Sequence, residues 1–247
     1  MRTYSSAIGL GLVMILGGAA RGEIVESTGS FTSLGKTIHI ERFEPAEPGK
    51  YPAIVVLHGA GGMEVGGPEF RIFSRELARR GYVAQLVHYF DQTGTERADL
   101  SVILKSFSAW MVTIGDAITL LQHQEIVDPG RIGLLGFSLG SYLSLSVASR
   151  DSRVSAVVEY FGGLPELFAR NLQRFPPTLI LHGEADEIVP VSEARKLEKI
   201  LSDKEFPFEI RVYPGQGHGF RGEPNVDAYQ RSIAFFDKHV KKAKGPS

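Results

Sequence analysis

The sequence predicts an α/β fold in which a mostly parallel, doubly wound sheet carries helices on both faces. Apolar runs of strand length alternate with longer stretches of helical period, and such alternation implies parallel βαβ units. The run at residues 51–57 is apolar throughout, as in a strand that is buried on both faces. Polar clusters follow several strands, so the fold should bring these clusters together at the carboxyl edge of the sheet.

The composition fits one globular domain, which we assign to residues 23–247. The chain has 247 residues, of which 43% are hydrophobic and 22% are charged. A net charge of -1 offers no basic face to nucleic acid. The absence of cysteine excludes disulfides, a thiol nucleophile and cysteine-ligated metal sites.

Residues 1–22 are expected to form a secretory signal peptide. A positive charge at Arg2 precedes an apolar run and then a group of small residues, and cleavage is expected after Ala20 or Gly22. The apolar run is shorter than the roughly 20 residues of a membrane span. We therefore expect no stable membrane span after cleavage and a periplasmic or secreted mature protein.

The first elements follow from simple patterns. Residues 37–43 alternate apolar and polar side chains, as a half-exposed strand does, and a turn with two prolines leads to the buried strand at 51–57. Residues 68–80 place apolar side chains on one helical stripe that Gly81 ends, and residues 82–87 form the next strand.

The middle of the chain contains the longest predicted loop and a clear helix. Residues 88–99 are polar and should lie over one end of the sheet. Residues 107–122 have apolar side chains at spacings of three and four, which predicts an amphipathic helix. A turn at 128–130 then leads into the strand at 131–135.

The last part of the chain continues the alternation. Residues 159–177, rich in Gly, Phe and Pro, are expected to form a loop or a short lid. The other expected elements are strands at 154–158, 178–181 and 208–213 and helices at 192–201 and 228–240.

Residues 136–140 have the sequence Gly-Phe-Ser-Leu-Gly between an apolar strand and a helix-compatible run. This pattern predicts a nucleophile elbow, in which a tight turn holds the hydroxyl of Ser138 above the sheet edge at a helix N-terminus. A Cβ atom at Gly136 or Gly140 would collide with the neighbouring backbone, which explains the glycines.

A serine nucleophile needs a base and a group that orients the base. His218, in a glycine-rich loop after the last strand, is predicted to accept the proton of Ser138. Asp186 follows the strand before it and is predicted to orient His218. The chain order Ser, Asp, His is the order expected in such a fold.

Three other carboxylates could replace Asp186 as the acid. Glu184 and Glu187 lie in the same loop, and Glu159 lies at the end of the strand that follows the elbow helix. We favour Asp186 because its loop continues as Ile-Val-Pro and should turn inward, whereas Glu184 and Glu187 should be solvated.

The glycine-rich turn at residues 58–62 follows the buried strand at 51–57 and can direct backbone N–H groups at one point. We predict an oxyanion hole formed by the N–H groups of Ala60 and Leu139, with Gly61 as the alternative to Ala60. The other histidines have no metal-ligand spacing, so no metal and no cofactor are expected. Four aromatic residues near the site could line an apolar pocket or belong to the core: Phe137, Tyr160, Phe161 and Phe220.

Three motifs, at residues 127–140, 182–190 and 217–220, resemble the dienelactone hydrolase family of the α/β-hydrolase superfamily. The likeness runs from Tyr51 to Val240 and implies an eight-stranded sheet and hydrolysis of esters or lactones through an acyl-enzyme. Two positions depart from that family's enzyme, which has cysteine where this chain has Ser138 and glutamate where it has Gly59. Ordinary serine-esterase chemistry is therefore the better expectation.

The sequence thus predicts a serine hydrolase that acts on a small ester or lactone and binds no nucleic acid. A serine peptidase or amidase is the alternative within the same fold, because the same triad cleaves amides. A binding protein that keeps the fold without catalysis is the alternative from another class.

Overall fold

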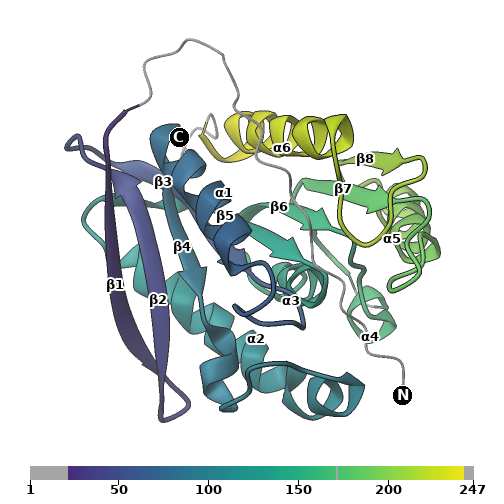
Figure 1. Cartoon of the computed structure of the whole chain (residues 1–247), viewed down its shortest axis with the longest axis horizontal. Coiled ribbons are helices and arrows are strands. Elements are labelled where there is room, and N and C mark those ends of the chain that lie inside the picture. The colour runs from purple at the N-terminus through teal and green to yellow at the C-terminus, as the bar shows by residue number, and fades with distance from the viewer. Residues whose placement is uncertain (1–21, 171, 242–247) are drawn as a thin grey trace.

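The computed structural model describes residues 22–170 and 172–241, which form one eight-stranded sheet in the order β1-β2-β4-β3-β5-β6-β7-β8 (Figure 1). All neighbouring strands from β4 to β8 pair in parallel, whereas β1 and β2 are antiparallel to their neighbours. The expected mostly parallel sheet, with eight strands, is confirmed. The predicted signal peptide lies outside the described residues, apart from Gly22.

The strands and helices alternate along the chain after an initial hairpin. The strands are β1 (Ile24–Ser33), β2 (Lys36–Pro45), β3 (Tyr51–Leu57), β4 (Val83–Val87), β5 (Val127–Phe137), β6 (Val154–Tyr160), β7 (Thr178–Gly183) and β8 (Phe208–Tyr213). The helices are α1 (Gly67–Arg79), the short η1 (Tyr89–Gln92), α2 (Leu100–Gln122), α3 (Leu139–Ala148), α4 (Glu166–Ala169), α5 (Ser192–Asp203), α6 (Glu223–Phe236) and a final π-helical turn, η2 (Asp237–Lys241).

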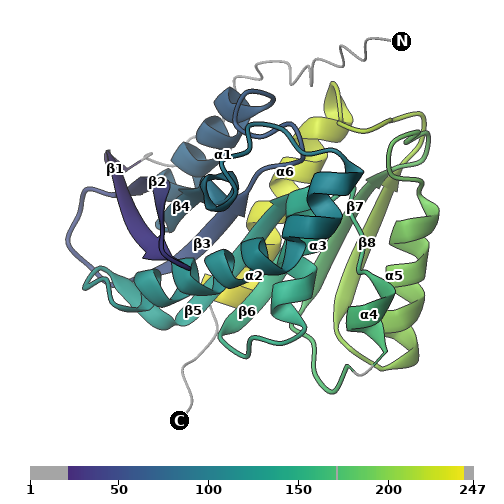
Figure 2. The same cartoon turned by 90° about the horizontal axis from the view of Figure 1, so that it is seen from below.

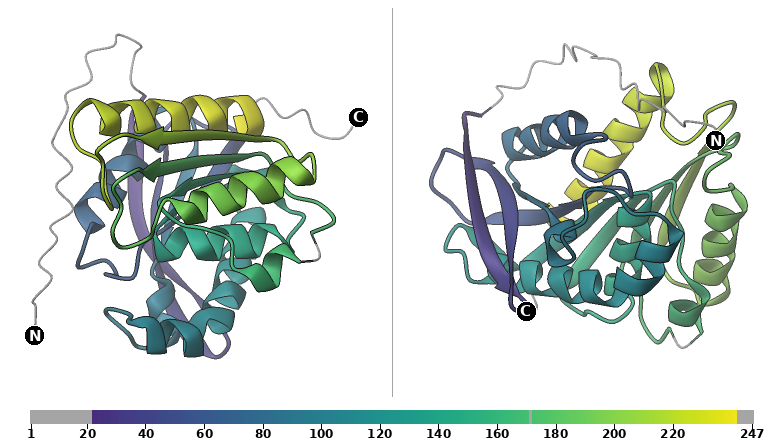
Figure 3. Two further views of the ribbon diagram at one scale, coloured as in Figure 1. Left: turned by 90° about the vertical axis from the view of Figure 1, so that its right-hand side faces the viewer. Right: turned by 60° about the horizontal axis from the view of Figure 1, so that its bottom comes forward.

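Helices cover both faces of the sheet, as predicted. On one face α1 and α6 bury Phe70, Leu77 and Phe236, and on the other α2, α3 and α5 bury residues such as Trp110 and Leu197. Figure 2 and Figure 3 show α6 on one side of the sheet and α3 with α5 on the other. Because β3 and β5 to β8 are parallel, their carboxyl ends meet at one edge of the sheet, and the elbow and the loops of Asp186 and His218 lie there.

Several elements differ from the sequence predictions, among them β5, which begins at Val127 and runs through the predicted turn at 128–130, and α6, which begins at Glu223 and not at residue 228. Strand β1 was not predicted separately, because most of its side chains are exposed and show no alternation. Helix α2 begins at Leu100, directly after the polar stretch and before the predicted start at residue 107, because the Asp99 side chain accepts the N–H of Val102 at 2.9 Å and caps the helix. The expected loop at 159–177 is shorter, since β6 extends to Tyr160 and α4 occupies part of it.

Helix α2 is the one helix of the described residues that is long and apolar enough to cross a membrane by length and composition alone. Its inner side chains Trp110, Ile114 and Ile118 are fully buried. Their contacts with the sheet and its other helices identify α2 as a core helix of this domain.

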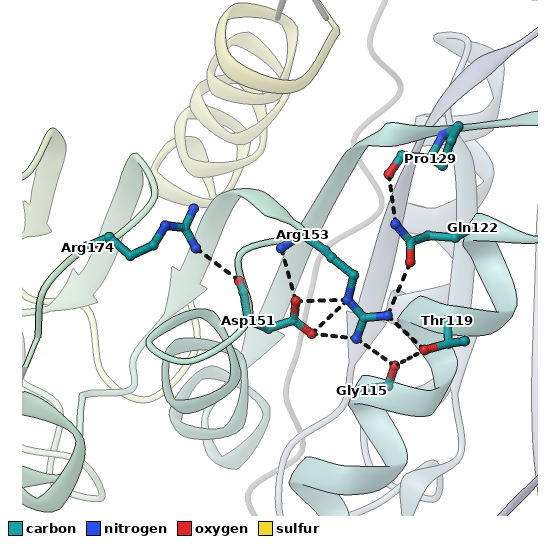
Figure 4. A network of polar contacts seen from close by, with 7 residues as sticks. All are labelled: Gly115, Thr119, Gln122, Pro129, Asp151, Arg153 and Arg174. Carbon is teal, nitrogen blue, oxygen red and sulfur yellow. Dashed lines mark hydrogen bonds and ion pairs between the residues drawn. The ribbon is translucent and has the colours of Figure 1, made fainter. Parts of the chain in front are cut away.

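The amino edge of the sheet contains a polar network around Arg153 (Figure 4). Its guanidinium donates to the carboxylate of Asp151, to Thr119 and Gln122, and to the carbonyl of Gly115. A hollow of about 490 Å³ lies beside it. The network ties α2 to the turn between α3 and β6. Because the guanidinium nitrogens of Arg153 already have partners, we assign the network a structural role.

The close approach of β5, α3 and β3 explains the two glycines of the elbow. A Cβ on Gly136 would collide with the backbone of Gly140, and one on Gly140 would collide with the carbonyl oxygen of Leu57 and lie 2.6 Å from that of His58. The steric reason given from the sequence for these glycines is therefore confirmed.

We expect Gly140→Ala to lower the free energy of unfolding by about 3 kcal/mol or more, because backbone atoms must move to admit the methyl group. Gly115→Ala is the matched control, since a Cβ there meets only Arg153 Nη2, at 4.0 Å. In the interior of α2 this change should stabilise the protein by about 0.5–1 kcal/mol. Urea unfolding of both variants checks the pair, and equal stabilities would contradict the steric argument.

Candidate active site

Ser138 lies between β5 and α3 in a conformation that few non-glycine residues adopt, with φ 54° and ψ -117°. The turn is held by two backbone bonds: the N–H of Ser138 donates to the oxygen of Tyr160 at 2.9 Å, and the N–H of Ser141 donates to that of Ser138 at 2.9 Å. A left-handed backbone at a serine is strained, and such strain occurs mainly where function requires it. The turn presents the hydroxyl at the carboxyl edge of the sheet.

The structure brings Ser138, His218 and Asp186 together in that order. Ser138 Oγ lies 2.9 Å from His218 Nε2, and His218 Nδ1 lies 2.8 Å from Asp186 Oδ2. With the imidazole proton on Nδ1, that N–H donates to Asp186 and the Ser138 hydroxyl donates to Nε2. This arrangement can remove a proton from the serine.

The Asp186 carboxylate is held on both of its oxygens. Its Oδ1 accepts the N–H groups of Ile188 and Val189, each at 2.9 Å. Burial acts to raise the pKa of Asp186, but the bond with His218, its charge and the two N–H groups outweigh burial and lower that pKa. Asp186 is therefore ionised at neutral pH although it is only 6% exposed.

The rival carboxylates do not contact His218. Glu184 and Glu187 are exposed to solvent, as expected from the sequence. Glu159 is fully buried, and its carboxyl accepts the N–H of Gly162 instead. Of the four candidates, Asp186 alone has a hydrogen bond to the imidazole among the described residues.

The predicted oxyanion-hole donors have free N–H groups. Among the hydrogen bonds of the described residues, none is donated by the backbone of Ala60, Gly61 or Leu139. Free donors at the start of a helix and in a glycine-rich turn can stabilise a developing negative charge. Both Ala60 and Gly61 are available, so the choice between them stays a prediction.

His58 anchors the turn that carries these donors. Its ring stacks on Tyr89 with centroids 4.1 Å apart, and the Tyr89 hydroxyl donates to the carbonyl of His58 at 2.8 Å. Burial lowers the pKa of His58 to about 4, so the ring is neutral at neutral pH. Its role is therefore structural.

The aromatic side chains near the site belong mainly to the core. Tyr160, Phe161 and Phe220 are each 5% exposed or less, and Phe137 is partly buried against them. Phe161 also contacts the site, since its ring centroid lies 4.7 Å from that of His218. No group of histidine or acidic side chains within the described ranges could hold a metal ion.

Sequence reasoning did not find the roles of two buried residues beside the triad. His182 donates from Nε2 to the carbonyl of Val189 at 2.8 Å and so supports the loop of Asp186. Glu159 lies behind the elbow, and the sequence considered it only as a rival acid. Their positions at the ends of β7 and β6 could have indicated both, but the direction of each side chain could not be read from the sequence.

The strand order, the elbow after β5 and the polar groups after β7 and β8 define a protein of the α/β-hydrolase fold. The profile of the dienelactone hydrolase family matches residues 40–240. Because this match covers most of the sequence, the chain belongs to the dienelactone hydrolase family, a family of hydrolases. The resemblance found in the motifs is thereby confirmed.

Individual proteins are more distant. The chain is 25% identical over 197 residues to a carboxymethylenebutenolidase homolog of Xenopus tropicalis, and the alignment covers 75% of this chain and 77% of the relative. It matches the structure of a dienelactone hydrolase-like promiscuous phosphotriesterase from metagenomic libraries with a TM-score of 0.76 and 16% identity, over 88% of this chain and 99% of that one. An acylaminoacyl peptidase of Pyrococcus horikoshii matches with a TM-score of 0.73 and 18% identity, over 91% of this chain and 43% of that one. At these identities the two structures share the fold alone.

Proposed function

We propose that this protein hydrolyses carboxylic esters or lactones, without a metal or cofactor, through an acyl-enzyme formed on Ser138. The observation that carries the proposal is the pair of hydrogen bonds that links Ser138 through His218 to Asp186, 2.9 and 2.8 Å long, at a strained strand-to-helix turn. Membership of a hydrolase family supports it. Serine in place of the family's usual cysteine makes ordinary ester chemistry the expected reaction.

In the acylation step, Ser138 Oγ attacks the carbonyl carbon of the substrate while His218 Nε2 takes the hydroxyl proton. Asp186 balances the charge of the imidazolium that forms. The N–H groups of Leu139 and Ala60, or Gly61 in its place, donate to the negative oxygen of the tetrahedral intermediate.

The intermediate then collapses as the bond to the leaving oxygen breaks. His218 gives its proton to that oxygen, which yields a free alcohol from an ester or a tethered hydroxyl from a lactone. A water molecule next attacks the acyl-enzyme, with His218 again as the base. The acid leaves and the hydroxyl of Ser138 is restored.

A serine peptidase or amidase is the second candidate, because an acylaminoacyl peptidase shares the fold. That match covers 43% of the peptidase, so the rest of that chain has no counterpart in the alignment. We expect kcat/KM for an activated short-chain ester or a lactone to exceed that for the amide of the same acyl group. A preference for the amide would favour the peptidase alternative.

Labelling with a fluorophosphonate tests the mechanism directly. The probe should react with one residue, and peptide mass spectrometry should identify that residue as Ser138. Ser138→Ala should abolish labelling, while Ser146→Ala, on the helix that follows Ser138, should label as the wild type does. A native, folded protein that takes up no label would favour a binding protein without catalysis.

The proposal includes a periplasmic or extracellular location for the mature protein, because residues 1–22 have the charge and apolar pattern of a signal peptide. N-terminal sequencing of protein exported by a bacterial host should find a start near Arg21 or Glu23. An unprocessed N-terminus in the cytoplasmic fraction would contradict this location.

A further inference from the structure

Glu159 is a fully buried acid directly behind the elbow. It belongs to β6, and its side chain lies on the α3 face of the sheet, because Val157, two residues earlier, belongs to the core on that face. Its Oε2 accepts the N–H of Gly162 at 2.8 Å. Its Oε1 is buried and has no hydrogen-bond partner among the described residues, so the acid is held through one oxygen.

Gly162 joins this carboxyl to the nucleophile turn. A Cβ on Gly162 would collide with the Cβ of Ser141 and would lie 3.2 Å both from Glu159 Oε2 and from the backbone oxygen of Ser138. The Glu159 carboxyl and the elbow therefore both pack against Gly162. Any movement of Gly162 must disturb one or both of them.

Phe161, the residue before Gly162, links the same segment to the base. Its φ of 44° is rare for a bulky side chain, so its neighbours must hold it in place. Its N–H donates to the oxygen of Leu181 at 2.8 Å, and its ring packs against the His218 imidazole with centroids 4.7 Å apart. The position of this ring restricts the imidazole on one side.

The surroundings of Glu159 disfavour a negative charge. Burial raises the pKa of Glu159 to about 8, although the N–H of Gly162 and the hydroxyl of Ser141 act to lower it. No cation of the described residues contributes to this shift of the pKa. The titratable groups that face it are the phenol of Tyr142 on α3 and, around that phenol, Glu193 of α5 and Asp186. A neutral carboxylic acid is the form that this site accommodates at pH 7.

We propose that Glu159 is a positioning residue which, as a neutral carboxylic acid, holds Phe161 and Gly162 against the elbow and against His218. The inference rests on the proposed function, because this positioning matters only if Ser138 and His218 react. Ionisation would leave a charge without a cation in a site closed to water, so water must enter and the segment must move. The charge would also oppose the negative oxygen that forms on the substrate at Ser138.

The first test measures stability and needs no activity. The folded protein keeps the Glu159 proton up to about pH 8, whereas the unfolded carboxyl loses it near 4.5. Between these values the folded state binds one proton more than the unfolded state, so rising pH favours unfolding. Relative to Glu159→Gln, the folding equilibrium constant of the wild type should fall about tenfold per pH unit between pH 5.5 and 7.5.

Glu193→Gln is the matched control, since this carboxylate on α5 faces the same tyrosine but is partly exposed and pairs with Lys196. It should follow the wild-type pH dependence. Parallel stability curves for the wild type and Glu159→Gln would overturn the proposal. If Glu159→Gln does not fold, infrared spectra of the wild type replace it: a protonated carboxyl band present at pH 6.5 and lost by pH 9 is expected, and its absence at pH 6.5 overturns the proposal.

The second test is the pH profile of kcat. We expect wild-type kcat to fall by about tenfold from pH 7 to pH 9, as Glu159 ionises. Glu159→Gln should keep its kcat at pH 7 within about threefold and lose the alkaline decline, whereas a purely structural role would leave the decline in place. The two proposals can fail separately. If the wild type and Glu159→Gln differ in the pH dependence of their stability but the protein hydrolyses no ester, the proposed function is wrong and the proposal that Glu159 is a neutral acid still holds.

Discussion

Ser138→Ala should reduce kcat/KM for an ester substrate by about 10⁴- to 10⁶-fold, which is the loss seen when the nucleophile of a serine triad is removed. The methyl group cannot form the acyl-enzyme, so only the oxyanion hole and substrate binding can still accelerate attack by water. The substitution should add no backbone strain at this residue, because alanine and serine both carry a Cβ atom and are equally disfavoured at φ 54°. The fold should therefore survive, as circular dichroism and the unfolding midpoint can verify.

Ser146→Ala is the matched control for this experiment. Ser146 lies on α3, the helix that follows Ser138, and its hydroxyl is buried without a hydrogen-bond partner among the described residues. Its removal should leave kcat/KM within about twofold and should not lower stability, because a buried hydroxyl without a partner contributes no bond. If Ser138→Ala kept more than a tenth of the wild-type activity, the elbow serine would not be the nucleophile.

Asp186→Asn should lower kcat by roughly 10³- to 10⁴-fold while the loop keeps its shape. The amide oxygen can still accept the N–H groups of Ile188 and Val189, which now bond to Oδ1 at 2.9 Å. The amide nitrogen, however, would donate to Nδ1 of His218, so the imidazole proton would move to Nε2. An Nε2 that carries a proton cannot accept the proton of Ser138, and the base is lost.

The variant Glu187→Gln supplies the comparison, because Glu187 was a rival acid from the sequence and is exposed one residue further along the same loop. It should change kcat by less than about twofold. KM for both variants should stay near the wild-type value, since neither side chain is assigned to substrate binding. If Glu187→Gln lowered kcat as much as Asp186→Asn does, catalysis would depend on the negative charge of the loop and not on the hydrogen bond to His218.

The elements that the sequence predicted best are those whose pattern has a local cause. Continuous apolar runs predicted the buried strands, and spacings of three and four predicted most of α2. The glycines at 136 and 140 predicted the elbow, because only a very close approach of strand and helix requires both. Strand β1 was not predicted, because this exposed strand at the sheet edge shows no alternation of apolar and polar side chains.

The sequence by itself thus determined the fold class, the elbow at Ser138 and the strand ends that carry the acid and the base, because these follow from local patterns and from the common edge of parallel strands. Only the tertiary structure decided which carboxylate meets His218. Asp186 turns inward onto the imidazole, while Glu184 and Glu187 face solvent and Glu159 is buried behind the elbow. The sequence favoured Asp186 from its loop, but the choice depends on the direction of side chains from segments far apart in the chain, which residue spacing alone does not determine.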